Sequence, residues 1–192
     1  ESARGSESAR GSERTSGLRK IKVKSGDGKD AFEIKSKDDG AKLVAPDESE
    51  IARFNVSGSK MKIKDADDKV LAYVIASAGK YKVENAEQDT VLWKLQRQDD
   101  GDWKLEDGAE KLIYKIKKRD YGFELEDGHE NSLAKVKAKD GKTSLRDASD
   151  KTVLYTKSPV SSIAFVSLGF DSIHSLPIRA ALTAMLTIDE QD

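Results

Sequence analysis

The sequence contains no cysteine, which excludes a disulfide framework, a thiolate metal site and a cysteine nucleophile. It also lacks an excess charge of either sign, because 34 Lys and Arg residues are balanced by 35 Asp and Glu residues for a net charge of -1. No overall field therefore favours nucleic acid or an acidic partner, and we expect no nucleic-acid ligand. The absence of cysteine does not define the compartment, so a cytoplasmic location and an envelope-tethered lipoprotein are both compatible with the sequence.

No stretch of the sequence is long and apolar enough for a membrane-spanning helix. The most apolar region, residues 160–188, is interrupted by Asp171, His174, Pro177 and Arg179. The longest uncharged run after Arg179 has about nine residues, whereas crossing a bilayer takes about 20. The sequence therefore predicts no transmembrane span, and this region needs another apolar environment.

Motifs of catalysis are also absent. There is no G-x-S-x-G nucleophile elbow. Gly141-Lys142-Thr143 matches the end of a phosphate-binding loop, but Val136 stands where that motif requires a glycine, and the following residues alternate like a strand. A turn fits this segment better, so we expect a protein that is not an enzyme and that holds no cofactor.

The side chains that commonly bind metals are scattered or explained by turns. His129 and His174 lie about 45 residues apart, and an exposed or internally satisfied histidine accounts for each of them. The carboxylate clusters at residues 65–68 and 99–102 raise the alternative of calcium, but neither continues as an EF-hand loop. Because aspartate favours tight turns, we expect turns at both clusters and no metal site.

The first 17 residues, ESARGSESARGSERTSG, are a near-duplicated hexapeptide with almost no apolar surface. Such a segment cannot offset its ordering entropy, so residues 1–17 are predicted to be a disordered linker. Two origins fit: a remnant of expression or cleavage, or a native tether from which a signal and a lipid-anchored cysteine have been removed. Residues 18–192 are predicted to form a single domain.

What the sequence does contain is a repeat of about 20 residues. One apolar position recurs seven times, at spacings of 20 residues with one spacing of 22. These anchor residues are Val23, Leu43, Ile63, Val83, Leu105, Leu125 and Leu145. In each unit, as in residues 61–75 (MKIKDADDKVLAYVI), an acidic turn separates two stretches that alternate between apolar and polar residues. Period-two alternation around such a turn predicts one β-hairpin per unit.

Seven consecutive hairpins favour a closed antiparallel barrel over other repeat folds. A propeller blade needs about 40 residues and four strands, so the chain would complete fewer than four blades. A β-solenoid would stack ladders of identical side chains, whereas the anchor position varies among Val, Leu and Ile. A meander of up to about fourteen strands would instead curl and close, which removes its edges.

The C-terminal segment provides a filling for such a barrel, because a wall of more than about eight strands leaves a lumen. Ser175 is a candidate N-cap and Pro177 lies in the first turn, so a helix is predicted over about residues 176–188. Its apolar side chains recur at helical spacing: Ile178, Ala181, Leu182, Met185 and Leu186. Since the remaining positions are mostly small, this helix is predicted to be buried inside the barrel.

Lysine-flanked hairpins that end in one hydrophobic helix resemble the tubby C-terminal-like superfamily, which includes tubby domains, LURP-one-related proteins and phospholipid scramblases. The similarity rests on residues 81–95 (YKVENAEQDTVLWKL), 112–128 (LIYKIKKRDYGFELEDG) and 175–186 (SLPIRAALTAML), and it covers about residues 18–190. It implies a mainly β fold, a closed antiparallel barrel of about 12 strands around a buried central C-terminal helix. Seven hairpins exceed that count, so we expect an irregular first unit or one hairpin outside the barrel.

The resemblance also bears on function. Tubby domains bind phosphoinositide headgroups through basic strand residues, and scramblases were named for moving lipids. No phosphoinositide-site motif and no scramblase calcium ligands match this sequence residue by residue, so the resemblance implies an anionic lipid ligand without assigning its site.

The densest run of positive charge is residues 111–119 (KLIYKIKKR), with five basic residues in nine positions. On a strand, Lys115, Lys117 and Arg119 share one face. Together with Lys118 they are the candidate ligand-binding residues, because such a stripe can meet lipid headgroups or phosphate. A solvated outer face, whose lysines discourage edge pairing, explains the run equally simply.

Together these features predict a non-enzymatic binding module whose ligand is an anionic lipid or phosphoinositide headgroup at a membrane surface. The alternative is a tethered structural or protein-interaction domain of a bacterial-type cell envelope, whose partner would be another protein.

Overall fold

The computed structural model describes residues 18–190, which form 14 β-strands followed by short helices. The strands are β1 (Ile21–Ser25), β2 (Asp30–Lys37), β3 (Gly40–Val44), β4 (Glu50–Ser57), β5 (Lys60–Asp65), β6 (Val70–Ser77), β7 (Lys80–Asn85), β8 (Val91–Arg97), β9 (Trp103–Asp107), β10 (Leu112–Arg119), β11 (Gly122–Glu126), β12 (Ser132–Lys139), β13 (Lys142–Asp147) and β14 (Thr152–Thr156). The helices are α2 (Ser162–Val166), the 3-10 helix η1 (Ser167–Gly169) and α3 (Leu176–Asp189). Residues 1–17, for which a disordered linker is predicted, lie outside the described part of the chain.

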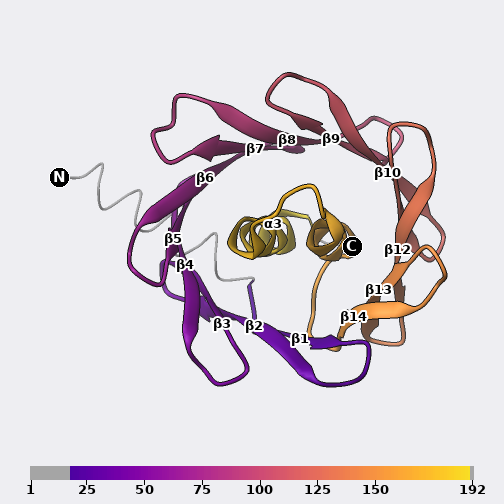
Figure 1. Cartoon of the computed structure of the whole chain (residues 1–192), viewed down its shortest axis with the longest axis horizontal. Coiled ribbons are helices and arrows are strands. Elements are labelled where there is room, and N and C mark those ends of the chain that lie inside the picture. Colours follow the sequence, from indigo (N-terminus) through magenta and orange to yellow (C-terminus); the bar gives the residue numbers. More distant parts are fainter. Residues whose placement is uncertain (1–17, 191–192) are drawn as a thin grey trace.

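The strands form one closed antiparallel barrel, in which each strand pairs with its neighbours in sequence (Figure 1). Strands β1 and β14 complete the ring, with Val23 opposite Thr156 and Ser25 opposite Leu154. Closure pairs the backbone groups that an open sheet would leave free at its two edge strands. The predicted class, a mainly β closed barrel with a central C-terminal helix, is confirmed.

All seven hairpins belong to the wall, so the count of about 12 strands implied by the family resemblance is too low. The first hairpin is neither outside the barrel nor unlike the others. In β1 the register shifts directly after the anchor Val23, and the same shift accompanies the anchor in each of the other six hairpins. Each unit thus has its own turn and its own bulge, and all seven hairpins take equivalent places in the wall.

The anchor residues face the lumen, one from each odd-numbered strand, and all are at most 4% exposed. Their neighbours in sequence point outward; Lys62 and Lys64, for example, flank Ile63 on β5. Burying one such aliphatic side chain stabilises the fold by roughly 1.5–3 kcal/mol relative to leaving it in water. The alternation of the sequence therefore produces an apolar inner wall and a lysine-rich outer wall.

The two ends of the barrel differ in how the strands are connected. At the loop end, connections of four or five residues lead from odd to even strands: residues 26–29, 45–49, 66–69, 86–90, 108–111, 127–131 and 148–151. At the turn end, five of the six connections have two residues: 38–39, 58–59, 78–79, 120–121 and 140–141. The sixth, residues 98–102, lies in the unit with the 22-residue spacing.

The acidic residues of the loop end shape its connections. Asp65 Oδ1 accepts hydrogen bonds from the backbone N–H groups of Asp67 and Lys69, at 2.9 and 3.0 Å. Asp68 has a positive φ of 69°, as expected for a type I turn that ends in a left-handed bulge residue. At the other acidic cluster, in the turn-end connection 98–102, Asp100 Oδ1 accepts from the backbone N–H of Asp102 at 2.9 Å. The prediction of turns at both carboxylate clusters is confirmed.

Two odd strands begin with a glycine because a neighbouring strand lies too close for a side chain. A Cβ at Gly40 would lie 1.9 Å from the carbonyl oxygen of Phe54, and one at Gly122 would lie 2.2 Å from that of Val136. Comparable close approaches occur at the loop end, where a Cβ at Gly26 would lie 2.0 Å from the carbonyl oxygen of Thr152.

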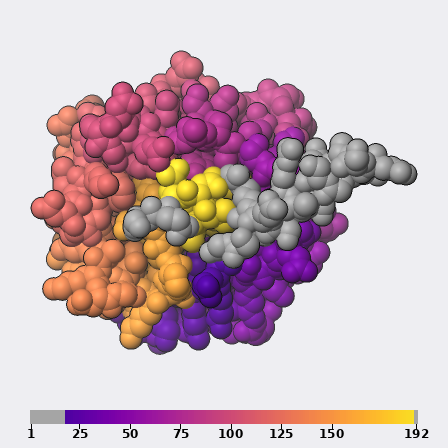
Figure 2. Space-filling view, turned by 180° about the vertical axis from the view of Figure 1, so that it is seen from behind, coloured from indigo at the N-terminus to yellow at the C-terminus, as the bar shows by residue number. Residues whose placement is uncertain are grey.

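A helical hairpin fills the lumen (Figure 1). The chain enters at the turn end as α2, with Ser161 as N-cap, passes through η1 and reverses near the loop end. Helix α3 then returns to the turn end, and the Ser175 side chain accepts a hydrogen bond from the N–H of Ile178 at its start. Helix α2 packs against β11 to β13, whereas α3 packs against β3 to β6. The C-terminal end of α3 lies within the mouth at the turn end, ringed by the wall (Figure 2).

The sequence predicted α3 correctly, from its N-cap Ser175 to within one residue of its end. It did not predict α2, whose five residues are too few for a helical period to be seen. No helix among residues 18–190 has the length and apolar character needed to cross a bilayer.

Candidate functional site

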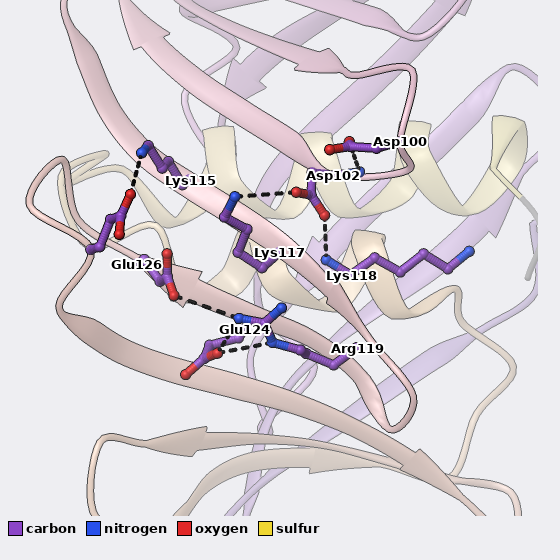
Figure 3. Close-up of polar contacts among 9 residues, drawn as sticks. Asp100, Asp102, Lys115, Lys117, Lys118, Arg119, Glu124 and Glu126 are labelled. Carbon is purple, nitrogen blue, oxygen red and sulfur yellow. Dashed lines mark hydrogen bonds and ion pairs between the residues drawn. The ribbon is translucent and has the colours of Figure 1, made fainter.

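The predicted cationic residues on the outer face of β10 are paired with carboxylates of the protein itself (Figure 3). Lys115 Nζ lies 3.0 Å from Glu130 Oε1. Lys117 Nζ lies 3.3 Å from Asp102 Oδ2. An incoming anion would therefore have to compete with a carboxylate that already occupies each lysine.

Arg119 is held in the same way. Its Nη2 lies 2.9 Å from Glu124 Oε1 and 3.7 Å from Glu126 Oε2. The hydrogen bond to Glu124 raises the pKa of Arg119, while hydrogen bonds from Ser132 and then Arg119 lower the pKa of Glu124. Both groups are thus fixed in their charged forms, and the pair neutralises itself locally.

Lys118, the fourth predicted residue, is separate from the other three. Its backbone N–H donates to Asp102 Oδ1 at 2.8 Å, but its side chain extends away from the carboxylates (Figure 3). It is exposed at the turn end of β10. The structure therefore brings Lys115, Lys117 and Arg119 to one face and leaves Lys118 off it, and a ligand-binding role for the four residues stays a prediction.

A larger concentration of positive charge lies on the wall beyond β11. It forms a surface hollow of about 770 Å³ at the turn-end half of β12 and β13, which we call the basic hollow. Its lining comprises Asp120, Tyr121, Lys137, Ala138, Lys139, Asp140, Lys142, Ser144, Arg146 and Lys157. Five cations thus face two carboxylates.

The cations of the basic hollow differ in how they are compensated. Asp150, outside the hollow, lies 3.0 Å from Lys137 Nζ and 3.4 Å from Arg146 Nη1, and the hydrogen bond from Lys137 lowers its pKa. Among residues 18–190, by contrast, no carboxylate lies within ion-pair distance of Lys139, Lys142 or Lys157. These three lysines are the part of the hollow that is available to an external anion.

Aromatic rings flank two lysines of the basic hollow, one unpaired within residues 18–190 and one paired with Asp150. Lys142 Nζ lies 4.5 Å from the ring centroid of Tyr155, and Lys137 Nζ lies 5.5 Å from that of Tyr121. Both distances suit a cation–π contact. The rings hold the ammonium groups at the surface without neutralising their charge.

A second, smaller hollow continues the basic surface across β14 onto β1. It measures about 270 Å³ and shares Lys157 with the basic hollow. Its other cations, Lys22 and Lys24, lie 3.9 and 3.8 Å from the same Asp30 carboxylate oxygen, so each is only weakly paired. The basic surface therefore spans the seam where the barrel closes.

No dense run of basic residues marks this whole surface in the sequence, because its cations come from three separate segments. Only residues 135–142 (KVKAKDGK) carry a local signal, with four lysines in eight positions. Lys157 and Lys22 join it through closure of the barrel by β1 and β14, which pairs residues more than 130 positions apart.

The histidines do not converge on a shared site. His129 lies in an exposed loop, where its backbone N–H donates to Asp127 Oδ1, and His174 is exposed just before α3. Within residues 18–190, no group of three or more His, Asp or Glu side chains is arranged to hold a metal ion.

Comparisons with known proteins yield distant structural likenesses. No family model and no curated protein sequence matches the chain. An X-ray structure of a protein from Arabidopsis thaliana is 12% identical, with 82% of this chain and 93% of that chain covered and a TM-score of 0.44. An alternansucrase in complex with isomaltononaose is 15% identical, with 66% of this chain and 12% of that chain covered and a TM-score of 0.20. TM-scores this low support no argument about function, so membership of the tubby C-terminal-like superfamily stays a prediction.

Proposed function

We propose that this protein is a non-enzymatic binding module for phosphate-bearing anionic headgroups, built on a fourteen-stranded relative of the tubby C-terminal-like barrel. The observation that carries the proposal is the set of three lysines in the basic hollow, Lys139, Lys142 and Lys157, which have no carboxylate partner among the described residues. A phosphate with several oxygens can accept from more than one of these ammonium groups at once.

The energetics favour a membrane as the source of the headgroup. One Lys or Arg near an anionic bilayer contributes about 1 kcal/mol, so three unpaired lysines supply roughly a hundredfold in affinity. Lys22 and Lys24 on the adjoining strand extend the surface and add to this attraction. A free phosphate compound shares the same chemistry but meets fewer of these cations at a time.

The predicted stripe on β10 has a secondary role in this proposal. Its three outward cations are already compensated by Glu130, Asp102 and Glu124. Exposed pairs of this kind are worth only about 0–1 kcal/mol, so an anionic surface could recruit the cations, but with less gain than at lysines that are free.

The test is co-sedimentation with phosphatidylcholine vesicles that contain or lack phosphatidylserine or a phosphatidylinositol bisphosphate, at low and physiological salt. The variant Lys139→Glu/Lys142→Glu/Lys157→Glu removes the charge of the basic hollow. We expect binding that requires the anionic lipid, weakens as salt is raised, and falls by about a hundredfold in this variant.

Two matched triple variants make the site assignment specific. Lys115→Glu/Lys117→Glu/Arg119→Glu changes the stripe on β10, and Lys60→Glu/Lys62→Glu/Lys80→Glu changes an equal charge on another part of the wall. The proposed site is wrong if the stripe variant loses more binding than the hollow variant. The lipid proposal fails if no vesicle binds; pull-down of a specific protein would then favour the tethered interaction domain. Competition by soluble inositol phosphates separates a headgroup site from general attraction to the bilayer.

A further inference from the structure

The loop-end mouth of the barrel contains a cavity of about 400 Å³ on the side opposite the contacts of α3 with the wall. Strands β10 to β14 line one side of it, and η1, α3 and the segment between them line the other. The lining residues are Tyr114, Leu125, Leu133, Ala134, Leu145, Arg146, Asp147, Val153, Leu154, Leu168, Gly169, Asp171 and Arg179. The volume lies within the range of about 300–1,000 Å³ that is typical of small-molecule sites.

The lining is mostly apolar and reaches the surface. Leu133 and Val153 are 39% and 45% exposed, and they are the large apolar side chains that are most exposed among residues 18–190. Both belong to this cavity, whereas the equivalent positions in other hairpins, such as Ile51 and Leu71, are partly covered. An exposed apolar rim around a cavity marks a place where an apolar group can be removed from water.

Arg179 places a cation with unused hydrogen-bonding capacity in this apolar lining. Its Nη1 donates to the carbonyl oxygen of Leu168 at 3.2 Å and lies 3.7 Å from Asp171 Oδ1. Its Nε is buried and has no hydrogen-bond partner in the described part of the chain. The Asp171 side chain is 91% exposed, against 21% for Arg179, so the carboxylate that pairs with the guanidinium group within residues 18–190 is largely in water.

This arrangement is costly for an empty cavity. An unpaired buried donor on a charged group costs more than an exposed one, and buried polar atoms in native proteins are nearly always satisfied. Arg179 also lies in the first turn of α3, where the helix dipole disfavours a cation. A carboxylate that took two parallel hydrogen bonds from the Nε edge of the guanidinium group would relieve both costs, after a small rotation of the side chain.

We propose that the loop-end cavity binds a small carboxylate with an apolar body. The carboxylate pairs with Arg179, and the apolar body packs against Leu145 and Leu168 and passes out between Leu133 and Val153. This site shares Arg146 with the basic hollow, but it opens at the loop end and is lined by the plug, whereas the hollow lies on the outer wall toward the turn end, and carboxylate binding does not depend on headgroup binding.

The charges around the cavity determine how binding responds to salt. Arg146 donates to Ser144 and Asp150, and Asp147 accepts from two backbone N–H groups of its own turn, so Arg179 is the charged residue of this lining with a buried donor left unpaired by the described residues. The loop-end connections together carry eleven acidic and four basic residues, which oppose the approach of an anion. Since exposed charges are screened by salt and a partly buried pair is screened much less, carboxylate binding should hold or strengthen as salt is raised. Headgroup binding at the basic hollow should weaken.

Octanoate is a suitable probe, with octanol and octylammonium as neutral and cationic counterparts of similar shape. Titration by NMR would follow the arginine Nε–H signals, with that of Arg179 assigned by its loss in Arg179→Gln. We expect octanoate to shift this signal saturably, and to bind about tenfold or more tightly than octanol, as for a hydrogen bond to a charged group. Octylammonium should not bind.

Variants at the exposed rim test the cavity without changing Arg179, whose substitution could also disturb folding. Val153→Glu places a like charge at the opening and should weaken octanoate binding about tenfold or more, whereas the near-isosteric Val153→Thr should change it much less. Leu71→Glu makes the same type of change at the equivalent position of another hairpin and should leave binding unchanged. Binding of octanoate that does not perturb the Arg179 signal, or that is matched by octanol, would overturn the proposal, as would the absence of binding.

Discussion

The two mouths of the barrel contrast in how they hold the same helical plug. At the turn end, the Tyr81 hydroxyl donates to Asp189 Oδ2 at 3.0 Å and Glu190 Oε1 at 3.1 Å, and Arg97 Nη1 lies 2.7 Å from Glu190 Oε2. At the loop end, Arg179 is the corresponding polar side chain, and its Nε has no hydrogen-bond partner among residues 18–190. Both mouths are hollowed, by about 360 Å³ at the turn end and about 400 Å³ at the loop end, but the polar groups at the turn end pair with one another, whereas the loop-end cavity lies beside a cation with an unsatisfied donor.

The contrast shows which part of the plug fastens it and which part is free for binding. Burial, together with the carboxylates of Asp189 and Glu190, raises the pKa of Tyr81, so its hydroxyl remains a donor at every physiological pH. A network of this kind positions the end of α3 and leaves little for a ligand to gain. Where a buried donor is unsatisfied, binding of an acceptor is favourable, and we therefore place the proposed carboxylate site at the loop end rather than at the turn end.

The largest effect is expected when the plug is removed altogether. Truncation before Pro177 would expose the inner wall of a fourteen-stranded barrel, which its own side chains do not fill. We expect loss of the cooperative thermal transition measured by circular dichroism. Leu182→Ala, which deletes part of one fully buried side chain, should keep that transition and cost about 2–5 kcal/mol. A normal transition in the truncated protein would contradict the account of α3 as the filling of the lumen.

Breaking the turn-end network should have the next largest effect. Tyr81→Phe removes the donor shared by Asp189 and Glu190 while keeping the ring, so we expect a loss of about 1–3 kcal/mol in the free energy of unfolding, measured by chemical denaturation. Tyr114→Phe, which removes a hydroxyl bonded to Ser172 near the loop end, is the matched control and should cost less.

Tyr81→Phe should also change how the free energy of unfolding responds to alkaline pH. Because the pKa of Tyr81 is raised in the folded protein, its contribution is complete below the unfolded value of about 10 and is lost as the pH rises above it. Stability measured on both sides of that pH should therefore fall more steeply in the native protein than in Tyr81→Phe. Parallel profiles would show that the network does not depend on a neutral hydroxyl.

Removing the unsatisfied cation should cost much less. Arg179→Met keeps the length of the side chain and deletes its charge, and replacing an incompletely paired buried ion with an apolar group is often neutral or stabilising. We expect the free energy of unfolding to change by no more than about 1 kcal/mol in either direction. A loss as large as that of Tyr81→Phe would mean that the loop end fastens the plug as firmly as the turn end.

The smallest effect is expected in the loops themselves. Asp127 accepts from the N–H groups of His129 and Asn131 and from the side chain of Asn131, and these hydrogen bonds, with that side-chain amide first among them, hold its pKa below the usual 3.8. The stabilising effect of the ionised Asp127 carboxylate is present above pH 3.8 and is lost as the pH falls through the lower pKa of the folded state. Asp127→Asn keeps an acceptor that cannot titrate, as Asn85 does in another hairpin. Its melting temperature should be nearly unchanged at neutral pH and fall less than that of the native protein in acid.

Most of the wall could be predicted from the sequence because its determinants are local. The anchor positions, the alternation around them and the turn aspartates all lie within one unit of about 20 residues. The repeat alone indicated up to about fourteen strands, and only the family resemblance reduced the number to about 12. Helix α3 was predictable for the same reason, since Ser175, Pro177 and the helical spacing of its apolar residues are adjacent in the chain.

The sites depend on contacts that no local pattern contains. Lys117 is paired with Asp102, which lies in the connection between β8 and β9, so the stripe has less free charge in the structure than the sequence alone indicates. The basic hollow and the loop-end cavity each combine segments that come together only when the barrel closes or the plug folds back. In the sequence Arg179 only interrupts an apolar run, whereas the burial of its Nε without a partner among the described residues results from how the plug packs against the wall.

Amide hydrogen exchange along α3, measured by NMR, tests the contrast between the two mouths most directly. If the turn end fastens the plug and the loop end leaves room beside it, the hydrogen-bonded amides of residues 184–190 should exchange more slowly than those of residues 179–182, and saturating octanoate should slow the second group selectively. Uniform protection along the helix, or faster exchange at its C-terminal end, would contradict the account.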